Sequence, residues 1–292
     1  MKPPPFDYSV ADGLEHALEL LAANADEGKI IAGGQSLVPM LNFRLARPSV
    51  LIDVNGVQEL SGISRSGGEL RIGALTRHAA VERSPLIAGH WPLLRAAVRW
   101  VAHPQIRNRG TIGGSCCHSD PSAEMPVALT ALDARFIARS AARGERELRS
   151  AEMFAGQLEN GLEDDELLIA IRVPAVAPRS GHAFREFARR KGDYALGGAA
   201  VTLALAGDGT CSSASIALLG AGPVPARATA AEQVLVGSDP VTAAVDAAAA
   251  AIDGIAPTGD LHGSSDYRRH LIGVLTRRAI LEAAGRAREE DA

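Results

Sequence analysis

"TIGGSCCHSDPSAEMP" occupies residues 111–126 and crowds two glycines, two cysteines, a histidine and two carboxylates into sixteen positions. Three kinds of site could need this combination: a metal site, a nucleophile beside its base, or a backbone cradle for an anionic cofactor. A second twin-glycine segment, AGGQS at residues 32–36, also carries a serine shortly after its glycines. Any explanation of the first segment therefore has to be weighed against the second.

The cysteines argue against a metal site, because metal ligands have to converge. Cys116 and Cys117 are adjacent, and the only other cysteine of the sequence, Cys211, is far along the chain. Neighbouring side chains on an extended chain point to opposite sides, so an adjacent pair does not readily grip one ion. Three cysteines also fall short of the four that an iron–sulfur cluster takes. We therefore expect no metal, and expect both cysteines to be small packing residues.

An activated thiol is the second reading, since Cys117 stands beside His118. Such pairs usually come from distant parts of a chain, because sequence neighbours rarely reach hydrogen-bond geometry. We expect no catalytic residue here. His118 is expected to form a polar wall of a binding site or to be a satisfied surface histidine.

The anion cradle accounts best for both glycine segments. Glycine permits left-handed backbone and close approach, and successive N–H groups in such a turn bind phosphate oxygens. A helix is expected to begin directly after 32–36, which would add its positive N-terminal end. Two cradles suit a ligand with two phosphates held between two lobes. The sequence contains neither G-x-G-x-x-G nor G-x-x-x-x-G-K-[ST], so it supports no Rossmann or P-loop site.

Residues 1–56 are predicted to form an α/β unit. Leucines and alanines on one face predict a helix over 10–24 with Ser9 as its N-cap. A short strand then runs into AGGQS, a helix follows in SLVPMLNFRLA, and VLIDV (50–54) is a strand of the buried type.

Residues 57–175 are predicted to form an α+β unit. Ser-Gly-Gly at 66–68 indicates a hairpin, and Thr76 is a candidate cap for a short helix. Further helices are expected in WPLLRAAVRWVAH and near 122–132, a second hairpin in ARFIARSAARGERELRS, and a strand in ELLIAIRVP.

A linker is expected at 174–181, and the third unit spans 179–287. Its first half, YALGGAAVTLALAGDGTCSSASIALLGAG, is typical of an antiparallel sheet. The remainder is rich in alanine and predicts helices near 243–251 and from Ser264 onward.

Composition excludes several classes of protein. The chain has 292 residues, 47% of them hydrophobic, and a formal net charge of −4, which offers no broad attraction to nucleic acid. No run approaches the ~18 apolar residues of a membrane span. The first ten residues hold no apolar core of signal-peptide length, and three cysteines make no disulfide framework. We therefore expect a cytoplasmic protein.

One known family combines both glycine segments. The chain resembles the FAD-binding medium subunit of molybdenum hydroxylases in AGGQSLVPMLNFRLARPSVLIDVN and HPQIRNRGTIGGSCCHSDPSAEMP, and also in RIGALT, ELLIAIRVP and FARRKGDYALGGAA. That family includes aerobic carbon monoxide dehydrogenase, xanthine dehydrogenase and bacterial enzymes that hydroxylate N-heterocycles. The similarity covers nearly the whole chain. SCC stands where relatives commonly carry Ala, Leu or Asn, so the branch, and with it the substrate, stays open.

The resemblance implies an α+β fold. Two FAD-binding subdomains of the PCMH/vanillyl-alcohol-oxidase type, residues 1–56 and 57–175, would hold the cofactor between them. A C-terminal antiparallel sheet with helices, residues 179–287, would complete the chain.

The resemblance also implies which residues hold FAD. Two diphosphate loops match the family: Ala32, Gly33, Gly34, Gln35 and Ser36, and Thr111, Ile112, Gly113, Gly114 and Ser115. Glu124 matches a carboxylate that contacts the adenosine half of FAD, and Ile169 an apolar position beside the flavin. Arg185 lies where some relatives place a basic contact, Tyr194 matches an aromatic that can lie against the isoalloxazine, and His118 occurs in some branches. A purely structural role is the alternative for each.

The resemblance finally implies a division of labour between subunits. A large molybdopterin subunit would oxidise the substrate, and two [2Fe–2S] clusters on a small subunit would carry the electrons to this FAD and on to an external acceptor. The heterotrimeric unit can pair into a dimer. Two alternatives stay open: a free-standing FAD-dependent reductase, for which no clear proton donor is found, and a flavin-free assembly subunit, against which the intact glycine segments argue.

Overall fold

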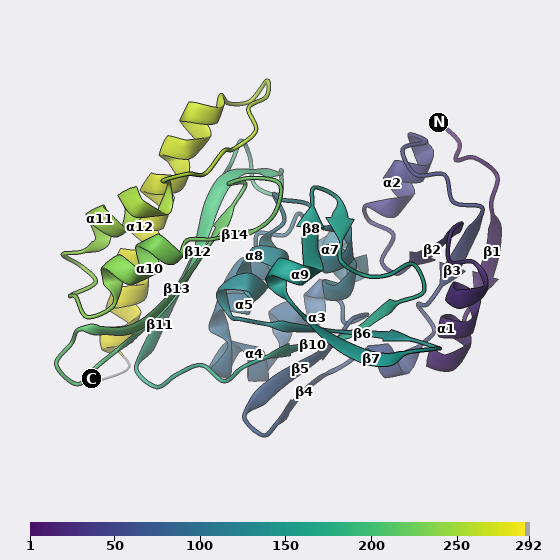
Figure 1. Ribbon diagram of the computed structural model, residues 1–292, viewed down its shortest axis with the longest axis horizontal. Coiled ribbons are helices and arrows are strands. Elements are labelled where there is room, and N and C mark those ends of the chain that lie inside the picture. Colours follow the sequence, from purple (N-terminus) through teal and green to yellow (C-terminus); the bar gives the residue numbers. More distant parts are fainter. Residues whose placement is uncertain (290–292) are drawn as a thin grey trace.

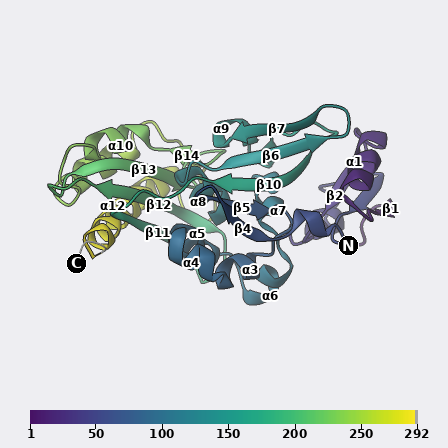
Figure 2. The same cartoon turned by 90° about the horizontal axis from the view of Figure 1, so that it is seen from below.

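The computed structural model describes residues 1–289 and has three larger β-sheets arranged along an elongated molecule, besides one small two-stranded sheet. The N-terminal unit and the C-terminal helices lie at opposite ends, with the largest sheet between them (Figures 1 and 2). Strands and helices are both present, and two of the three sheets are purely antiparallel, which confirms the predicted α+β class. Within the described residues, no helix is long and apolar enough to span a membrane.

The N-terminal sheet has three parallel strands in the order β1-β3-β2. Its elements are β1 Asp7–Val10, α1 Leu14–Ala23, β2 Gly28–Ile31, α2 Leu37–Asn42 and β3 Val50–Asp53. The strand β1 was not expected, since its side chains are mostly exposed and show no apolar alternation. Ser9 belongs to this strand and pairs with Ile52, so the predicted N-cap is wrong and Gly13 caps α1 instead.

The middle unit is a five-stranded antiparallel sheet in the order β4-β5-β10-β6-β7. Its strands are β4 Ile63–Ser66, β5 Glu69–Gly73, β6 Arg135–Ser140, β7 Gly144–Arg149 and β10 Leu167–Val173, with β8 Phe154–Gly156 and β9 Glu159–Asn160 as a separate pair. Both predicted hairpins are confirmed by the β4–β5 and β6–β7 pairing.

Short helices fill the connections of the middle unit. They are η1 Gln58–Leu60, α3 His78–Arg83, α4 Pro85–His90, α5 Pro92–Val98, α6 Pro104–Arg109, α7 Ile112–His118, α8 Glu124–Ala131 and α9 Ser150–Met153. Three of them begin with proline, whose fixed φ and missing N–H suit the first helical position. Thr76 is not a cap, as its hydroxyl bonds the backbone of Gly62, and α3 begins after Arg77.

The C-terminal unit is a four-stranded antiparallel sheet in the order β11-β12-β13-β14. Its elements are β11 Ser180–Ala188, β12 Ala195–Leu205, β13 Cys211–Leu219, β14 Ala226–Arg227, α10 Thr229–Leu235, α11 Ala244–Ala251 and α12 Ser265–Glu289. Helices cover one face of this sheet, and α5 and α8 of the middle unit pack on the other. Both faces are therefore buried, which explains the unbroken small and apolar run of β12.

Alternate residues of β12 belong to different hydrophobic cores. Ala200 packs in the core of the middle unit, whereas its neighbours Ala199 and Val201 pack beneath the C-terminal helices. The strand period of two produces this division, because successive side chains point to opposite faces. A third core joins α1 to the middle sheet.

Candidate functional site

The first glycine segment forms a turn with free backbone donors. It leaves the end of β2, and Gly34 has a left-handed φ of +72° before α2 begins. Within residues 1–289, the N–H groups of Gly33, Gly34, Gln35 and Ser36 donate no hydrogen bond. The Gln35 side chain donates to the Gly33 carbonyl at 3.0 Å and stiffens the turn. Four consecutive unpaired N–H groups fit an anionic oxygen-rich group such as a diphosphate.

The second glycine segment is the start of a helix rather than a loop. Thr111 is the N-cap of α7, and its hydroxyl accepts from the Gly114 N–H at 3.1 Å. The Gly113 N–H donates to the Ala74 carbonyl at 2.9 Å. Unlike the turn at 32–36, this segment uses these two N–H groups within the chain, and its contact with a cofactor stays a prediction.

Gly113 instead permits close packing of α7 on the middle sheet. A Cβ at this position would lie 2.6 Å from both the Cβ and the carbonyl oxygen of Ala74. Gly114 is exposed and would bring its Cβ 2.7 Å from the Thr111 hydroxyl. Thr111 itself is buried, so the half-buried Ser115 is the polar side chain that this segment presents toward its surroundings.

The two glycine segments meet in space. A Cβ on Gly33 would lie 2.4 Å from the carbonyl oxygen of Arg109 and 2.8 Å from the Cα of Gly110. The turn at 32–36 therefore packs against the backbone that leads into α7. Glycine is needed at this contact because both neighbours are backbone atoms.

Two polar residues that the sequence analysis did not single out form hydrogen bonds on both sides of the contact between the two glycine segments. Asn55 donates to the Ala32 carbonyl at 2.8 Å and accepts from Arg77 at 2.7 Å. Arg77 also donates to the Arg109 carbonyl. Asn55 lies two residues after β3, at the carboxyl edge of a parallel sheet, where ligand sites are common in α/β folds. Its position after a parallel strand was the signal that could have revealed it.

The charges around this contact favour an anion. The guanidinium groups of Arg77 and Arg109 interact electrostatically, and Asp53 lies near both. Burial alone would raise the pKa of Asp53, but hydrogen bonds from Tyr8 and Asn55 outweigh it and lower that pKa. Asp53 is thus held charged by its own partners, and both arginines remain cationic beside the 32–36 turn.

A second group of predicted residues gathers between α7 and the C-terminal unit. Burial raises the pKa of Glu124 to about 7, with a further contribution from Asp120 and an opposing one from Arg107. Partial burial, followed by the charges of Asp120 and Glu124, raises the pKa of Tyr194, although the residue as a whole is 67% exposed. The charge of Glu124 thus reaches Tyr194, although the resemblance assigns the two residues to different halves of FAD. Burial lowers the pKa of His118, which Asp120 partly offsets.

Sequence reasoning missed a buried carboxyl in this region. Glu186 on β11 is 7% exposed, and its Oε2 has no hydrogen-bond partner within the described chain. Burial, followed by the charge of Glu124, raises the pKa of Glu186 to about 9. The two carboxyls thus hold a proton between them at neutral pH.

Arg185 is engaged with the C-terminal helices, and its contact with FAD stays a prediction. It forms an ion pair with Glu282 of α12 at 2.5 Å, so it faces the C-terminal helices. Its neighbour Glu186 lies on the other face of β11, since successive strand residues alternate. The residue of this pair that faces Glu124 is therefore acidic rather than basic.

Ile169 lies in β10, and its carbonyl accepts from the Ala74 N–H at 3.0 Å. Its side chain is buried in the core that joins α1 to the middle sheet. The structure thus places it behind the start of α7, with its apolar group turned into protein.

The cysteines are buried thiols. Cys116 is fully buried and Cys117 is half-buried, and no cluster of potential metal ligands exists within residues 1–289. Burial raises the pKa of Cys116 well above its usual range and that of Cys117 to about 12, so both stay protonated at neutral pH.

We expect the double variant Cys116→Ala, Cys117→Ala to retain bound flavin at the wild-type ratio. Both thiols act as small apolar groups, so their loss removes packing and no ligand. The ratio of flavin absorbance to protein measures this. Metal analysis of the wild type is the control, and a stoichiometric metal that the variant loses would contradict it.

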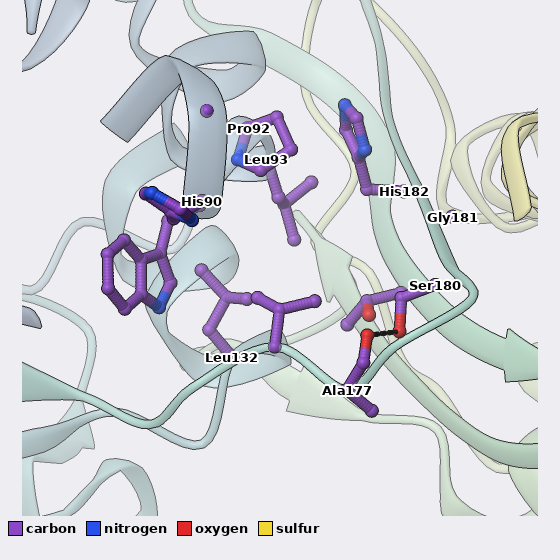
Figure 3. A pocket seen from close by; sticks show the side chains of 12 residues that line it. His90, Pro92, Leu93, Leu132, Ala177, Ser180, Gly181 and His182 are labelled. Atoms are coloured by element: carbon purple, nitrogen blue, oxygen red, sulfur yellow. Dashed lines mark hydrogen bonds between the residues drawn. The ribbon is translucent and has the colours of Figure 1, made fainter. Parts of the chain in front are cut away.

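A partly open cavity of about 150 Å³ lies elsewhere, at the junction of the middle and C-terminal units. Figure 3 shows His90 and Leu93 on one side of it, facing His182 and Ser180 on the strand side. Burial, followed by the charge of Arg286, lowers the pKa of His182 to about 4. None of the predicted cofactor residues lines this cavity.

Comparison with known proteins identifies the class. Residues 4–176 match the family model described as the FAD binding domain in molybdopterin dehydrogenase, and residues 182–283 match the CO dehydrogenase flavoprotein C-terminal domain. The chain belongs to the family of FAD-binding medium subunits of molybdenum hydroxylases. It is accordingly the FAD subunit of a multi-subunit, molybdenum-dependent oxidoreductase.

Particular relatives cover the whole chain. The 6-hydroxypseudooxynicotine dehydrogenase complex subunit alpha of Paenarthrobacter nicotinovorans is 48% identical over 99% of this chain and 97% of its own length. The caffeine dehydrogenase subunit beta of Pseudomonas sp. (strain CBB1) is 41% identical over 98% and 97%. A solved carbon monoxide dehydrogenase of Hydrogenophaga pseudoflava superimposes with a TM-score of 0.95 at 38% identity, covering 98% of this chain and 99% of that one.

Proposed function

We propose that this chain takes electrons from [2Fe–2S] clusters of a small partner subunit, holds them on FAD, and passes them to an external acceptor. A large molybdopterin subunit would oxidise the substrate in the same heterotrimeric unit. The observation that carries the proposal is the contact between the glycine segments, where four N–H groups at 33–36 have no partner within the described residues. FAD supplies the redox chemistry when bound, and the chain positions it and sets its surroundings.

The 32–36 turn would bind the diphosphate through its backbone, with Arg77 and Arg109 supplying positive potential. Thr111, Ile112, Gly113, Gly114 and Ser115 would form the opposite wall, and Ser115 would add a hydroxyl. Glu124, His118 and Tyr194 would lie along the remainder of the cofactor. In this proposal residues 1–56 and 57–175 share the cofactor, and residues 179–287 close the site.

No residue of this chain is assigned to substrate hydroxylation. The substrates printed in the names of the relatives include caffeine and 6-hydroxypseudooxynicotine, which are nitrogen-containing organic molecules. We propose an organic nitrogen compound as the substrate of the complex, oxidised on its large subunit.

The isolated chain, stripped of flavin, should take up FAD at about one per chain and bind FMN far more weakly. FMN lacks the second phosphate and the adenosine that the 32–36 turn and its neighbours would hold. Quenching of flavin fluorescence during titration measures both affinities. Equal affinity for FMN would overturn the diphosphate assignment.

Electron transfer is tested in the complex itself. A flavin-free complex should still reduce its iron–sulfur clusters with substrate but should reduce an external dye acceptor slowly, and added FAD should restore the rate. If dye reduction stays at full rate without flavin, electrons leave by another route and the proposed function is wrong.

A further inference from the structure

A buried histidine lies directly behind the second glycine segment. His78 is the first residue of α3 and is 3% exposed. Its backbone N–H donates to the Gly110 carbonyl at 3.0 Å, and its Nε2 lies 3.0 Å from the Ser115 hydroxyl. A Cβ on Gly110 would lie 3.0 Å from the Nδ1. His78 therefore supports both the backbone that Gly33 touches and the side chain that α7 presents.

The ring of His78 is neutral in the folded chain. Burial, followed by the charge of Arg107, lowers its pKa to about 4 and outweighs the Thr111 carbonyl, which favours the protonated form. A neutral imidazole has one N–H and one acceptor nitrogen. The proton of the neutral His78 ring is therefore on either Nδ1 or Nε2.

The surroundings of Nδ1 favour one of these two positions. Nδ1 is buried and has no hydrogen-bond partner within residues 1–289. Buried N–H groups without partners are rarer in proteins than acceptors without partners, because an unmade donor costs its full desolvation. We therefore assign the proton to Nε2, which then donates to the Ser115 oxygen. The Ser115 hydroxyl then keeps its own O–H free to donate elsewhere.

We propose that His78 is a positioning residue that orients the Ser115 hydroxyl as a hydrogen-bond donor to the diphosphate of the bound dinucleotide. The inference rests on the proposed function, since it needs a diphosphate in the 32–36 turn. It gives a role to a buried histidine whose Nδ1 has no hydrogen-bond partner within the described residues. Because the neutral ring has a single N–H, which is used on Ser115, His78 offers no second N–H that could replace the Ser115 hydroxyl as a donor to the diphosphate.

Two substitutions of His78 separate orientation from packing. The Nε2 of glutamine can occupy the place of the histidine Nε2 and donate, whereas leucine fills similar space without a donor. We expect His78→Leu to weaken FAD binding about tenfold to a hundredfold, the range of one hydrogen bond to a charged group. His78→Gln should stay within about threefold of the wild type, as the donor is restored.

A double-mutant cycle with Ser115→Ala supplies the decisive readout. Ser115→Ala alone should weaken FAD binding as His78→Leu does, and adding His78→Leu to it should cost less than about threefold more. His270→Leu, on the exposed surface of α12, is the control and should leave the affinity unchanged. Circular dichroism of each flavin-free variant checks that it is folded.

The outcomes are distinct. Failure of the wild-type chain to bind FAD would overturn the proposed function. Normal binding by the wild type with equal losses in His78→Leu and His78→Gln, or an undiminished loss in the Ser115→Ala background, would overturn this inference alone. If His78→Leu does not fold, Ser115→Ala decides, because an unchanged affinity there shows that the hydroxyl does not contact the cofactor.

Discussion

Gly33→Ala is expected to lower the affinity for FAD by about a hundredfold or more. The new Cβ would lie 2.4 Å from the carbonyl oxygen of Arg109 and 2.8 Å from the Cα of Gly110. Neither is part of a flexible side chain, so the 32–36 turn has to move away from α7. Loss of two charge-assisted hydrogen bonds to phosphate, at about 1.5–3 kcal/mol each, accounts for the effect, since each ~1.4 kcal/mol is tenfold. Fluorescence titration of the flavin-free chain measures it.

Gly285→Ala is the matched control. Gly285 lies in α12, and a Cβ there would meet no atom within 4 Å. Alanine favours helix, so this variant should bind FAD normally and be slightly more stable. An unchanged FAD affinity in Gly33→Ala would show that the turn does not hold the cofactor.

Glu186→Gln is expected to raise the free energy of unfolding of the flavin-free chain at pH 7 by about 1–3 kcal/mol. Burial and the neighbouring Glu124 raise the pKa of Glu186 to about 9, against an ordinary value of 4.5. The folded state therefore retains a proton that the unfolded state releases, and stability is lost as pH rises from 4.5 through 9. Glutamine carries no charge, so it removes this loss while keeping the shape. One pKa unit corresponds to ~1.36 kcal/mol of stability. The expected gain is smaller than the full difference in pKa would give, because Glu124 and Glu186 titrate together.

Urea unfolding of both proteins at pH 5.5 and pH 8.5 checks the sign. The advantage of glutamine should be larger at pH 8.5, because retaining the Glu186 proton that the unfolded chain releases costs more free energy at higher pH. Glu69→Gln, on the exposed edge of the β4–β5 hairpin, should change little at either pH. A gain that is the same at both pH values would contradict the argument, since it would then come from packing.

The pattern of apolar residues was sufficient for most elements. The hairpin at 66–68, the apolar strand β10 and the alanine-rich helix α11 are each determined by their own residues. The strand β1 was missed because its pairing with β3 is a tertiary contact that leaves its side chains exposed. Sequence periodicity reports side-chain burial, and β1 buries mainly its backbone.

The sequence pointed to both glycine segments, but it did not predict the backbone conformation of the second one. TIGGS was expected to be a phosphate-binding turn, because glycine permits left-handed backbone and close approach. The N-cap of Thr111 and the hydrogen bond from Gly113 to Ala74 hold it at the start of α7 instead. Arg185 and Glu186 differ by one position, and only the register of β11 decides which of them faces the middle unit.

The two-sided burial of β12 bears on how the chain folds. Ala200 completes the core of the middle unit, and Val201 completes the core beneath α12, so neither core can exclude water before this strand is in place. The family models divide the chain between residues 176 and 182, but we expect the parts on either side of this boundary to unfold together. Folding of the C-terminal sheet is thus coupled to that of the α5 and α8 surface it covers. During synthesis from the N-terminus, the apolar surface of α5 and α8 stays exposed to water until β12 has left the ribosome.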